Sequence, residues 1–366
     1  MSLKFKYDYL LVGAGLFNAV IANESAKTGK KCLVVEKRMH IGGNLYNESI
    51  EGINIHTYGP HIFHTNNPTI WKYLAELAPF NHFINSPLAK YKDELFNLPI
   101  NMNTFHQLWN VVTPEEAKKK LEEQREPKNN PGNFEEQALA LCGKDIYNKL
   151  LKGYTEKQWG RPAKLLPGFL IERLPVRYTY NNNYFNSTFQ GIPIGGYNGI
   201  IDKCFRECDI LLDCNYNLEK KIGKEAETII YTGMIDEYYD YCFGMLEYRS
   251  LQFEHQVLDT DNYQGNAVVN YTDREIPYTR IVEHKHFEFG KQAKTVITKE
   301  YPCKWEKGME AYYPVNTEWN KNLFLKYDQL SKREHHVFFG GRLGRYEYVN
   351  MDQTIENALT LFRKLN

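Results

Sequence analysis

The sequence predicts an α/β protein with two further parts, a helical insert and an antiparallel β-sheet domain. Three observations indicate this class. Residues 7–44 read as strand, glycine turn, helix, strand and second glycine turn. Residues 103–153 carry helical periodicity with clear helix-start signals, and from residue 245 onward apolar and polar residues alternate as in strands.

The first unit has the pattern of a Rossmann-like dinucleotide-binding domain. An apolar strand at residues 7–12 ends in Gly13-Ala14-Gly15. Gly13 allows the tight turn, and Gly15 leaves room for a pyrophosphate at the N-terminus of the helix that begins near Leu16. A second strand delivers Glu36 about 20 residues beyond the glycines, where its carboxylate can accept both ribose hydroxyls. Together these features favour a dinucleotide site over an ordinary strand-turn-helix.

Two further features of this dinucleotide-binding pattern bear on the cofactor. Asn18 stands where the fingerprint usually has glycine or alanine, and the sequence offers no reason for it. The pair Gly42-Gly43, followed by Asn44, is common in FAD enzymes with this type of domain, so FAD is favoured over a nicotinamide cofactor. No second glycine fingerprint occurs, which argues against a separate NADPH domain.

Composition narrows the possible partners. The 366 residues suffice for about two or three domains. Forty-five basic and 45 acidic residues cancel, so no overall charge recruits nucleic acid or an anionic membrane. The absence of a long apolar run predicts no membrane insertion, and we expect a soluble, cytoplasmic protein. The seven cysteines lack a C-x-x-C pair and are expected to be free thiols.

The middle of the chain begins with a short loop and a hairpin. His61 and His64 lack the partners of a metal site, so no metal is expected; His61 is either a structural loop histidine or a ring beside a flavin. Asn67-Pro68 predicts a helix start, and residues 89–100 a hairpin. Helix caps at Thr113 and Asn133 indicate a small helical domain.

Residues 153–177 combine aromatic side chains with a broken helix. Tyr154 and Trp159 lie in the run KGYTEKQWG, and two packed aromatic residues are the plain alternative to a binding role. Prolines and glycine then interrupt the stretch that carries Arg173, a pattern typical of a mobile lid.

Apolar and polar residues alternate in the second half of the chain. Period two begins at Tyr178 and predicts strands there and in several later segments. Arg280 would share a strand face with apolar neighbours, which is unusual for a solvated arginine. His284 and His286 would share that face as sheet-surface residues. Asn350 or Asp352 is expected to cap the last helix, whose N-terminus would again face the cofactor.

Several stretches together resemble the bacterial UDP-galactopyranose mutase family of flavoenzymes, over most of the chain. The segments that carry the resemblance are GAGLFN, EKRMHIGGN, YGPHIFHT, LPINMNT, KGYTEKQWGR, LPVRYTYNNNYF, QGIPIGGY, EYRSLQF, PYTRIVEHK and GGRLGRYEYVNMD. KGYTEKQWG and YGPHIFHT are specific to this family, whereas the glycine fingerprint is not.

The resemblance implies roles for matching residues. Uracil would stack on Tyr154, Arg173 and Arg280 would grip the diphosphate, and His61 would lie against the flavin. Guanidinium groups suit this task because they bind phosphate in bidentate fashion. The implied catalytic residues are Arg280, Arg173 and His61. The implied substrate-binding residues are Asn85, Tyr154, Thr155, Trp159, Arg173, Tyr184, Arg249, Asn270, Arg280, Tyr313 and Tyr348. The implied cofactor-binding residues are Gly13, Gly15, Phe17, Glu36, Lys37, Gly43, Asn44, His61, Ile62, Arg342, Asn350 and Met351. Two departures from the family pattern are Leu150-Leu151, where relatives have phenylalanines, and Asn350, where many have aspartate.

The implied activity is the interconversion of UDP-galactopyranose and UDP-galactofuranose in galactofuranose biosynthesis for cell-surface polysaccharide. Reduced FAD would act as nucleophile through N5 with no net redox change, after reduction by an external reductant, in a homodimer. The UDP-N-acetylated sugar is a possible second substrate. The alternatives are an FAD-dependent oxidase or dehydrogenase of the amine-oxidase type, and a nucleotide-binding module without chemistry. Neither alternative needs a diphosphate grip and a lid together.

The expected domain limits follow from these patterns. The FAD-binding Rossmann-like domain comprises residues 1–80, 190–240 and 310–366; the helical insert, expected to serve dimerisation and the uridine side, residues 100–165; the antiparallel-sheet substrate domain, residues 85–99, 175–190 and 245–309; and the mobile lid, residues 160–177.

Overall fold

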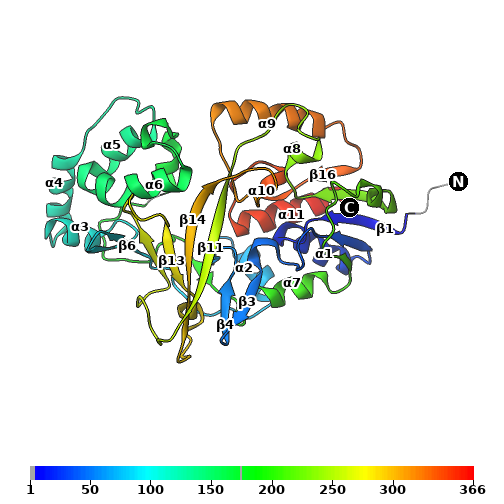
Figure 1. Ribbon diagram of the computed structural model, residues 1–366, viewed down its shortest axis with the longest axis horizontal. Coiled ribbons are helices and arrows are strands. Elements are labelled where there is room, and N and C mark those ends of the chain that lie inside the picture. Colours follow the sequence, from blue (N-terminus) through cyan, green and yellow to red (C-terminus); the bar gives the residue numbers. More distant parts are fainter. Residues whose placement is uncertain (1–4, 174) are drawn as a thin grey trace.

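The computed structural model describes residues 5–173 and 175–366. Figure 1 shows three parts side by side: a group of helices on the left, long strands in the centre, and an α/β part on the right that contains both ends of the chain.

A parallel sheet forms the centre of the α/β part. Its strand order is β16-β10-β1-β2-β9. The strands are β1 (Tyr7–Val12), β2 (Cys32–Val35), β9 (Asp209–Leu211), β10 (Ala226–Tyr231) and β16 (Val337–Phe339). Four of them are apolar on both faces because both faces are covered, as expected for a parallel sheet. The predicted Rossmann-like domain is therefore confirmed.

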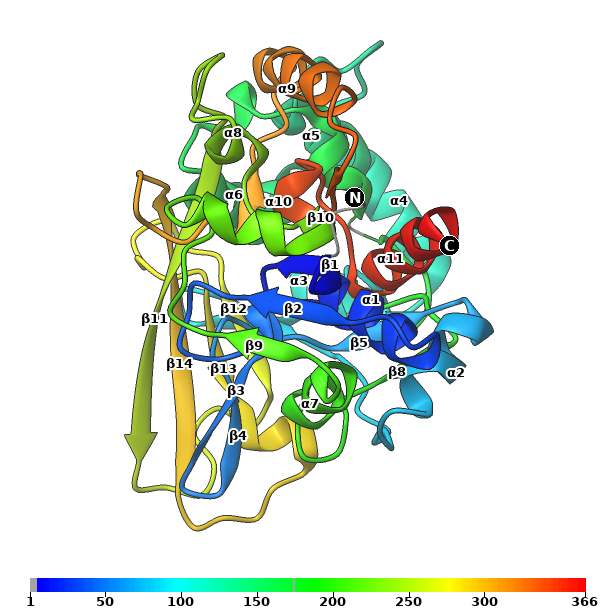
Figure 2. The same cartoon turned by 90° about the vertical axis from the view of Figure 1, so that its right-hand side faces the viewer.

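Helices cover one face of this sheet. They are α1 (Leu16–Lys27), α7 (Asn198–Phe205) and α11 (Met351–Leu365), which lie next to one another in Figure 2. The small residues Ala19 and Ala22 let α1 lie close to the strands, where it shares one core with Leu11 and Ile230. The opposite face packs on Tyr216 and its neighbours. The first glycine turn emerges where β1 passes into α1.

A second, mostly antiparallel sheet runs through the centre of the molecule. Its order is β15-β11-β14-β13-β12-β6-β7, and β12 pairs with β6 in parallel. The strands are β6 (Leu88–Tyr91), β7 (Glu94–Asn97), β11 (Tyr248–Leu258), β12 (Val268–Tyr271), β13 (Arg280–Glu283), β14 (Thr295–Lys304) and β15 (Tyr313–Pro314). The predicted hairpin at residues 89–100 is confirmed as the pair β6 and β7.

Two strand predictions were wrong. Residues 284–288 form the 3-10 helix η6 (His284–Glu288), and His284 is buried rather than on a sheet surface. Its ring lies between the amide of His56 and the hydroxyl of Thr298, which withdraws it from the sheet face. Between residues 178 and 199, β8 (Phe189–Gly191) is the strand and Asn198 begins α7. Asparagine side chains there accept backbone N–H groups, for example Asn181 from residue 183, and so compete with strand pairing.

The helical insert has its own core. Its elements are α3 (Met102–Trp109), α4 (Pro114–Gln124), α5 (Phe134–Ile146), the π-helix η2 (Tyr147–Leu151), α6 (Lys152–Trp159) and the 3-10 helices η3 (Ala163–Leu165) and η4 (Gly168–Arg173). Thr113 and Asn133 cap α4 and α5 as predicted. The insert core contains Phe105, Leu121 and Ile146. The last helix of the insert, α6, lies against the central sheet.

The remaining helices and strands complete these parts. They are η1 (Gly43–Leu45), β3 (Asn47–Ile50), β4 (Ile53–His56), β5 (Phe63–Thr65), α2 (Pro68–Ala75), η5 (Lys220–Glu225), α8 (Ile235–Tyr238), α9 (Glu318–Ser331) and α10 (Gly341–Gly344). Asn67 caps α2 and Asn350 caps α11, both as predicted. Among the residues described, we find no helix whose length and apolar character would let it span a membrane.

Candidate active site

The two glycine turns of the α/β part touch each other. Gly13 has a φ of 95°, and a Cβ there would lie 2.4 Å from Thr232 Oγ1. A Cβ on Gly43, which has a φ of 54°, would lie 2.9 Å from the Cα of Gly15. In contrast, no described atom lies within 4 Å of where a Cβ of Gly15 would be. The turns thus leave open backbone at the start of α1, the place where a pyrophosphate binds in this fold.

Asn18, which the sequence left unexplained, closes the first turn. Its side chain is fully buried, and Nδ2 donates to the carbonyls of Val12 at 3.0 Å and Gly13 at 2.8 Å. Thr232 Oγ1 also donates to Val12 O, at 2.8 Å. Asn18 therefore ties α1 to the end of β1 by hydrogen bonds, where glycine or alanine would do so by close packing.

An acidic and a basic side chain complete this turn. Glu36 is buried, and its carboxylate accepts the amides of Ala14 at 2.7 Å and Arg38 at 2.9 Å. Arg38 Nη2 donates to Asn44 Oδ1 at 3.1 Å, while its buried Nη1 lacks a partner among the described residues. Lys37, predicted to contact the cofactor, is half exposed. Arg38 is therefore the better placed of the two cations.

These residues fit a dinucleotide cofactor. The fold leaves open backbone at Gly15, holds a carboxylate at the end of β2 and keeps a buried guanidinium nitrogen available beside Asn44. Phe17, also predicted to bind the cofactor, packs in the core, and a Cβ on Gly340 would overlap its ring at 2.3 Å. It therefore packs against the chain at Gly340 and Gly341, just before Arg342.

A cavity of about 360 Å³ reaches the α/β part at Arg342, Asn350 and Met351. It is lined by Pro60, His61, Ile62, His64, Asn85, Pro87, Tyr154, Tyr184, Phe185, Val268, Asn270, Arg280, Arg342, Tyr348, Asn350 and Met351. Eleven of the predicted site residues lie in this lining: His61, Ile62, Asn85, Tyr154, Tyr184, Asn270, Arg280, Arg342, Tyr348, Asn350 and Met351. They come from all three parts of the molecule.

Arg280 is the central charge of this cavity. It lies on β13 opposite Glu300 of β14, and its Nε is 3.3 Å from Glu300 Oε1. Nη2 donates to the Tyr154 hydroxyl at 3.2 Å. Burial disfavours the charge on Arg280, but the Glu300 carboxylate, together with the side chains of Tyr154, Tyr313 and Tyr348, raises the pKa of Arg280. The guanidinium therefore stays protonated and can meet an anionic ligand.

His61 is held as a neutral ring. Its Nδ1 donates to the Gly59 carbonyl at 2.8 Å, which leaves Nε2 as an acceptor. Its backbone N–H donates to His56 Nδ1 at 3.0 Å. Burial, reinforced by the charge of Arg342, lowers the pKa of His61 to about 4. His61 is therefore an uncharged hydrogen-bond acceptor at neutral pH.

A second guanidinium lies on the α/β side of the cavity. Arg342 of α10 donates to the carbonyls of Tyr312 and Val349, both at 3.1 Å. Its Cζ lies over the rings of Tyr313 and Tyr348, which stack on each other with centroids 5.4 Å apart. Tyr313, predicted to contact substrate, thus supports the residues that line the cavity.

Further polar groups point to a hydrogen-bonding ligand. Asn270 Oδ1 is buried in the cavity wall and lacks a partner within the described part of the chain. The hydroxyl of Tyr154 remains a neutral donor because burial raises its pKa to about 12. The cavity therefore combines fixed positive charge with neutral hydroxyl and amide groups, as a phosphorylated sugar requires.

Some predicted residues lie outside the lining. Thr155 is buried, and Trp159 packs against the core of the insert. Arg249 donates Nε to Gln158 O at 2.9 Å and Nη2 to Lys157 O at 3.4 Å, so its guanidinium binds the C-terminal end of α6. The side chain of Arg173 lies outside the described residues. The roles of these four in substrate binding stay predictions.

Other residues were missed by the sequence analysis. His64 and Phe185 stack with ring centroids 3.7 Å apart in the cavity wall. Glu300 is 1% exposed and pairs with Arg280. Period-two alternation along β14 would have suggested an inward carboxylate, but its partner depends on the register between strands. Lys157 was also missed, since its partners lie more than a hundred residues away.

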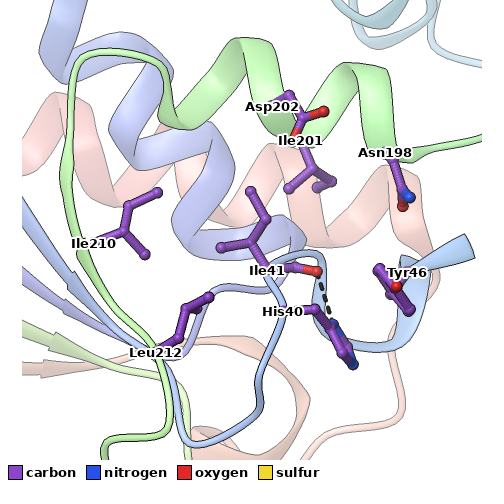
Figure 3. Close-up of a pocket in the computed structure, with 8 residues that line it drawn as sticks. All are labelled: His40, Ile41, Tyr46, Asn198, Ile201, Asp202, Ile210 and Leu212. Carbon is purple, nitrogen blue, oxygen red and sulfur yellow. Dashed lines mark hydrogen bonds between the residues drawn. The ribbon is translucent and has the colours of Figure 1, made fainter.

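A separate pocket of about 350 Å³ lies between α7 and the loop after β2 (Figure 3). It is lined by His40, Ile41, Tyr46, Asn198, Ile201, Asp202, Ile210 and Leu212. Four of its eight lining residues are aliphatic, and His40 Nδ1 donates to the Ile41 carbonyl at 2.9 Å, as Figure 3 shows. The charged and polar groups described above gather in the other cavity, which is the better candidate for chemistry.

Comparison with known proteins agrees with this geometry. Residues 149–348 match the family model described as UDP-galactopyranose mutase, and residues 11–77 match an NAD(P)-binding Rossmann-like domain. A dTDP-fucopyranose mutase of Escherichia coli is 37% identical, covering 96% of each chain. A probable UDP-galactopyranose mutase of Klebsiella pneumoniae is 38% identical, covering 96% of this chain and 93% of the relative.

A solved structure supports the fold. The crystal structure of a reduced UDP-galactopyranose mutase superposes with a TM-score of 0.75 at 15% identity, covering 98% of this chain and 95% of the other. The family model covers more than half of the chain, and the relatives align over nearly all of it. The chain belongs to the UDP-galactopyranose mutase family.

Proposed function

We propose that this protein is a flavin-dependent mutase that interconverts UDP-galactopyranose and UDP-galactofuranose without net redox change. The observation that carries the proposal is the position of Arg280. Its protonated guanidinium, paired with Glu300, shares one cavity with Tyr154 and His61. Family membership supports the same reaction class.

FAD is the cofactor that the dinucleotide turn is proposed to hold. Gly13, Gly15 and Gly43 would give backbone access to the pyrophosphate, and Glu36 would accept the ribose hydroxyls. When bound and reduced, FAD would supply the nucleophile for the anomeric carbon of the sugar. The proposal includes an external reductant, because oxidised flavin would have to be reduced before it could act. An isomerisation would then leave those electrons on the cofactor.

The side chains of the cavity would position the substrate and stabilise its leaving group. Arg280 would bind the diphosphate and hold the UDP leaving group while it is separated from the sugar. Tyr154, Tyr184 and Tyr348 would add neutral hydroxyl donors around the phosphates and sugar. His61, neutral at physiological pH, would offer an acceptor without adding charge. The protein would thus contribute orientation and charge, without a side-chain nucleophile.

A second nucleotide sugar has comparable support. The E. coli relative named dTDP-fucopyranose mutase is as similar to this chain as the Klebsiella relative. The same diphosphate-binding residues would serve a thymidine nucleotide. The oxidase alternative has less support, because oxidation of an amine does not need Arg280 in the position described.

The test is a comparison of substrates under reducing conditions. Purified protein with bound flavin is reduced with dithionite and mixed with UDP-galactofuranose or dTDP-fucofuranose, and the products are separated by chromatography. The proposal predicts pyranose product from UDP-galactofuranose with reduced protein. Faster conversion of dTDP-fucofuranose would reassign the substrate. Release of hydrogen peroxide in air, in step with substrate consumption and without isomerisation, would favour an oxidase. The homodimer and the cytoplasmic location stay predictions.

A further inference from the structure

Lys157 joins the helix that carries Tyr154 to the hairpin that carries Arg280. It lies on α6, three residues after Tyr154. Its Nζ donates to three backbone carbonyls: Tyr271 at 2.8 Å, Ile276 at 2.9 Å and Tyr278 at 2.9 Å. A protonated lysine has three N–H donors, and each of them is matched here by a carbonyl.

The three carbonyls belong to the connection between β12 and β13. Tyr271 is the last residue of β12 and follows Asn270; Tyr278 lies two residues before Arg280, which begins β13. Asn270 and Arg280 are paired across the two strands, and both line the cavity. A single ammonium group therefore holds the connection between β12 and β13, and the cavity residues Asn270 and Arg280 lie close to its two ends.

Close backbone packing supports the same junction. A Cβ on Gly153 would lie 2.3 Å from the carbonyl oxygen of Thr272, so α6 approaches this loop more closely than any larger residue would allow. Thr272 Oγ1 in turn donates to the Lys149 carbonyl at 2.6 Å. The junction is therefore specific in geometry. Lys157 is its buried cation, and the mostly exposed Arg274 adds an ion pair to Glu156 of α6 at 3.4 Å.

The charge on Lys157 persists at neutral pH. Burial lowers its pKa to about 8, against the opposing effect of the carboxylates of Asp273 and Glu275. The amine is therefore mostly protonated at pH 7 and retains three donors. Loss of the side chain would leave three carbonyls without this partner, which is costly where they are shielded from water.

We propose that Lys157 is a positioning residue for sugar-nucleotide binding, which acts by holding Tyr154 in register with Arg280. The hydrogen bond from Arg280 Nη2 to the Tyr154 hydroxyl, 3.2 Å long, crosses the junction that Lys157 closes. Without Lys157, α6 and the β12–β13 loop separate, so that Tyr154 and Arg280 no longer contact the same ligand. The residues of the dinucleotide turn take part in none of these junction contacts, so cofactor binding is unaffected. This inference rests on the proposed function for the identity of the ligand.

The test measures UDP binding to the oxidised holoenzyme by isothermal titration calorimetry. Lys157→Met should raise the Kd for UDP about tenfold, the effect of leaving a buried polar group unpaired. The flavin content and visible spectrum should match those of the wild type. Lys157→Arg keeps the charge and several donors, so it should recover most of the affinity. In turnover, Lys157→Met should raise KM more than it lowers kcat.

Lys152→Met is the matched control. Lys152 lies on the same helix, but its Nζ lies over the Tyr147 ring at 5.8 Å, and its loss should leave the Kd unchanged. Wild-type UDP affinity in a flavin-loaded Lys157→Met protein would overturn the inference, and so would loss of flavin together with UDP binding, since that indicates a general structural role. Failure of the wild type itself to bind UDP would overturn the proposed function first, and this inference with it.

Discussion

The two sides of the candidate active site draw on the chain very differently. The dinucleotide turn takes most of its groups from residues 13–44, and much of its function resides in the open backbone at Gly15, against which Gly43 packs. The neighbouring cavity takes its groups from positions as far apart as Asn85 and Met351, and these groups are side chains. Cofactor binding should therefore be sensitive to added atoms at the glycines, and substrate binding to lost contacts between distant elements.

The largest expected effect is at the glycine contact. Gly43→Val would force a Cβ to 2.9 Å from the Cα of Gly15 at a φ of 54°, where strain alone costs about 1–3 kcal/mol. We expect protein purified without flavin, measured by its visible absorbance. Gly52→Val is the control, because Gly52 has a similar φ of 70° but no described atom within 4 Å of its Cβ position. Flavin-loaded Gly43→Val protein would contradict the account of the turn.

Arg280→Ala should have the next largest effect, and only on the cavity side. It removes the buried cation and leaves Glu300 unpaired. We expect turnover to fall by about 10²–10³-fold, as for loss of a group that stabilises a leaving anion, with flavin retained. Arg333→Ala is the control, since that arginine is exposed in the turn after α9. If the fold is disturbed, the double variant Arg280→Met/Glu300→Gln removes the unpaired charge. Unchanged rates would remove Arg280 from the substrate site.

Acid should destabilise the loop that joins the two sides. His61 and His56 are buried, and burial lowers their pKa values to about 4 and about 3. Between those values and the ordinary pKa of histidine, the unfolded chain binds protons that the folded protein does not, so stability falls as pH falls. His61 alone should contribute about 3 kcal/mol to this loss.

The measurement is the free energy of unfolding by denaturant at about pH 7 and about pH 5. The variant His56→Asn should lose less stability between the two conditions, because one of the buried imidazoles is gone. His106→Gln, at an exposed position, should behave like the wild type. Equal pH dependence in all three proteins would show that the buried histidines do not govern acid sensitivity.

The smallest effect is expected at Asn18. Asn18→Gly restores the usual fingerprint but removes two hydrogen bonds to the carbonyls of Val12 and Gly13, which should cost about 1–2 kcal/mol of stability. Asn18→Asp should be worse, since a carboxylate cannot donate to either carbonyl. Thermal unfolding with flavin bound compares them. A more stable Asn18→Gly protein would show that the asparagine serves another purpose.

The sequence predicted the local features of the molecule but not the contacts between distant segments. The turn at Gly13 and Gly15, the acid at Glu36 and the caps at Thr113 and Asn350 are local, because the residues that define them lie within a few turns of one another. The partner of Arg280 and the three acceptors of Lys157 depend on strand register and on how α6 meets the sheet. The resemblance named many cavity residues but did not show that Arg249 binds the end of α6.

The two wrong strand predictions also failed because of contacts that a sequence pattern does not reveal. His284 belongs to a segment with strand-like alternation, yet its ring hydrogen bonds to His56 N and Thr298 fold the chain into a 3-10 turn. Asn181 and its neighbours follow a period-two pattern but bond to their own backbone. In both cases side-chain hydrogen bonds that are invisible to periodicity decided the conformation.

The most direct measurement compares the redox state of the flavin with the amount of sugar product formed. Reduced protein is mixed with excess UDP-galactofuranose without oxygen, and flavin absorbance and sugar product are followed together. The account predicts many molecules of UDP-galactopyranose formed per flavin while the flavin stays reduced, because positioning by Arg280 and Tyr154 serves an isomerisation. Oxidation of the flavin in proportion to the sugar consumed, or no product until the flavin is oxidised, would contradict it.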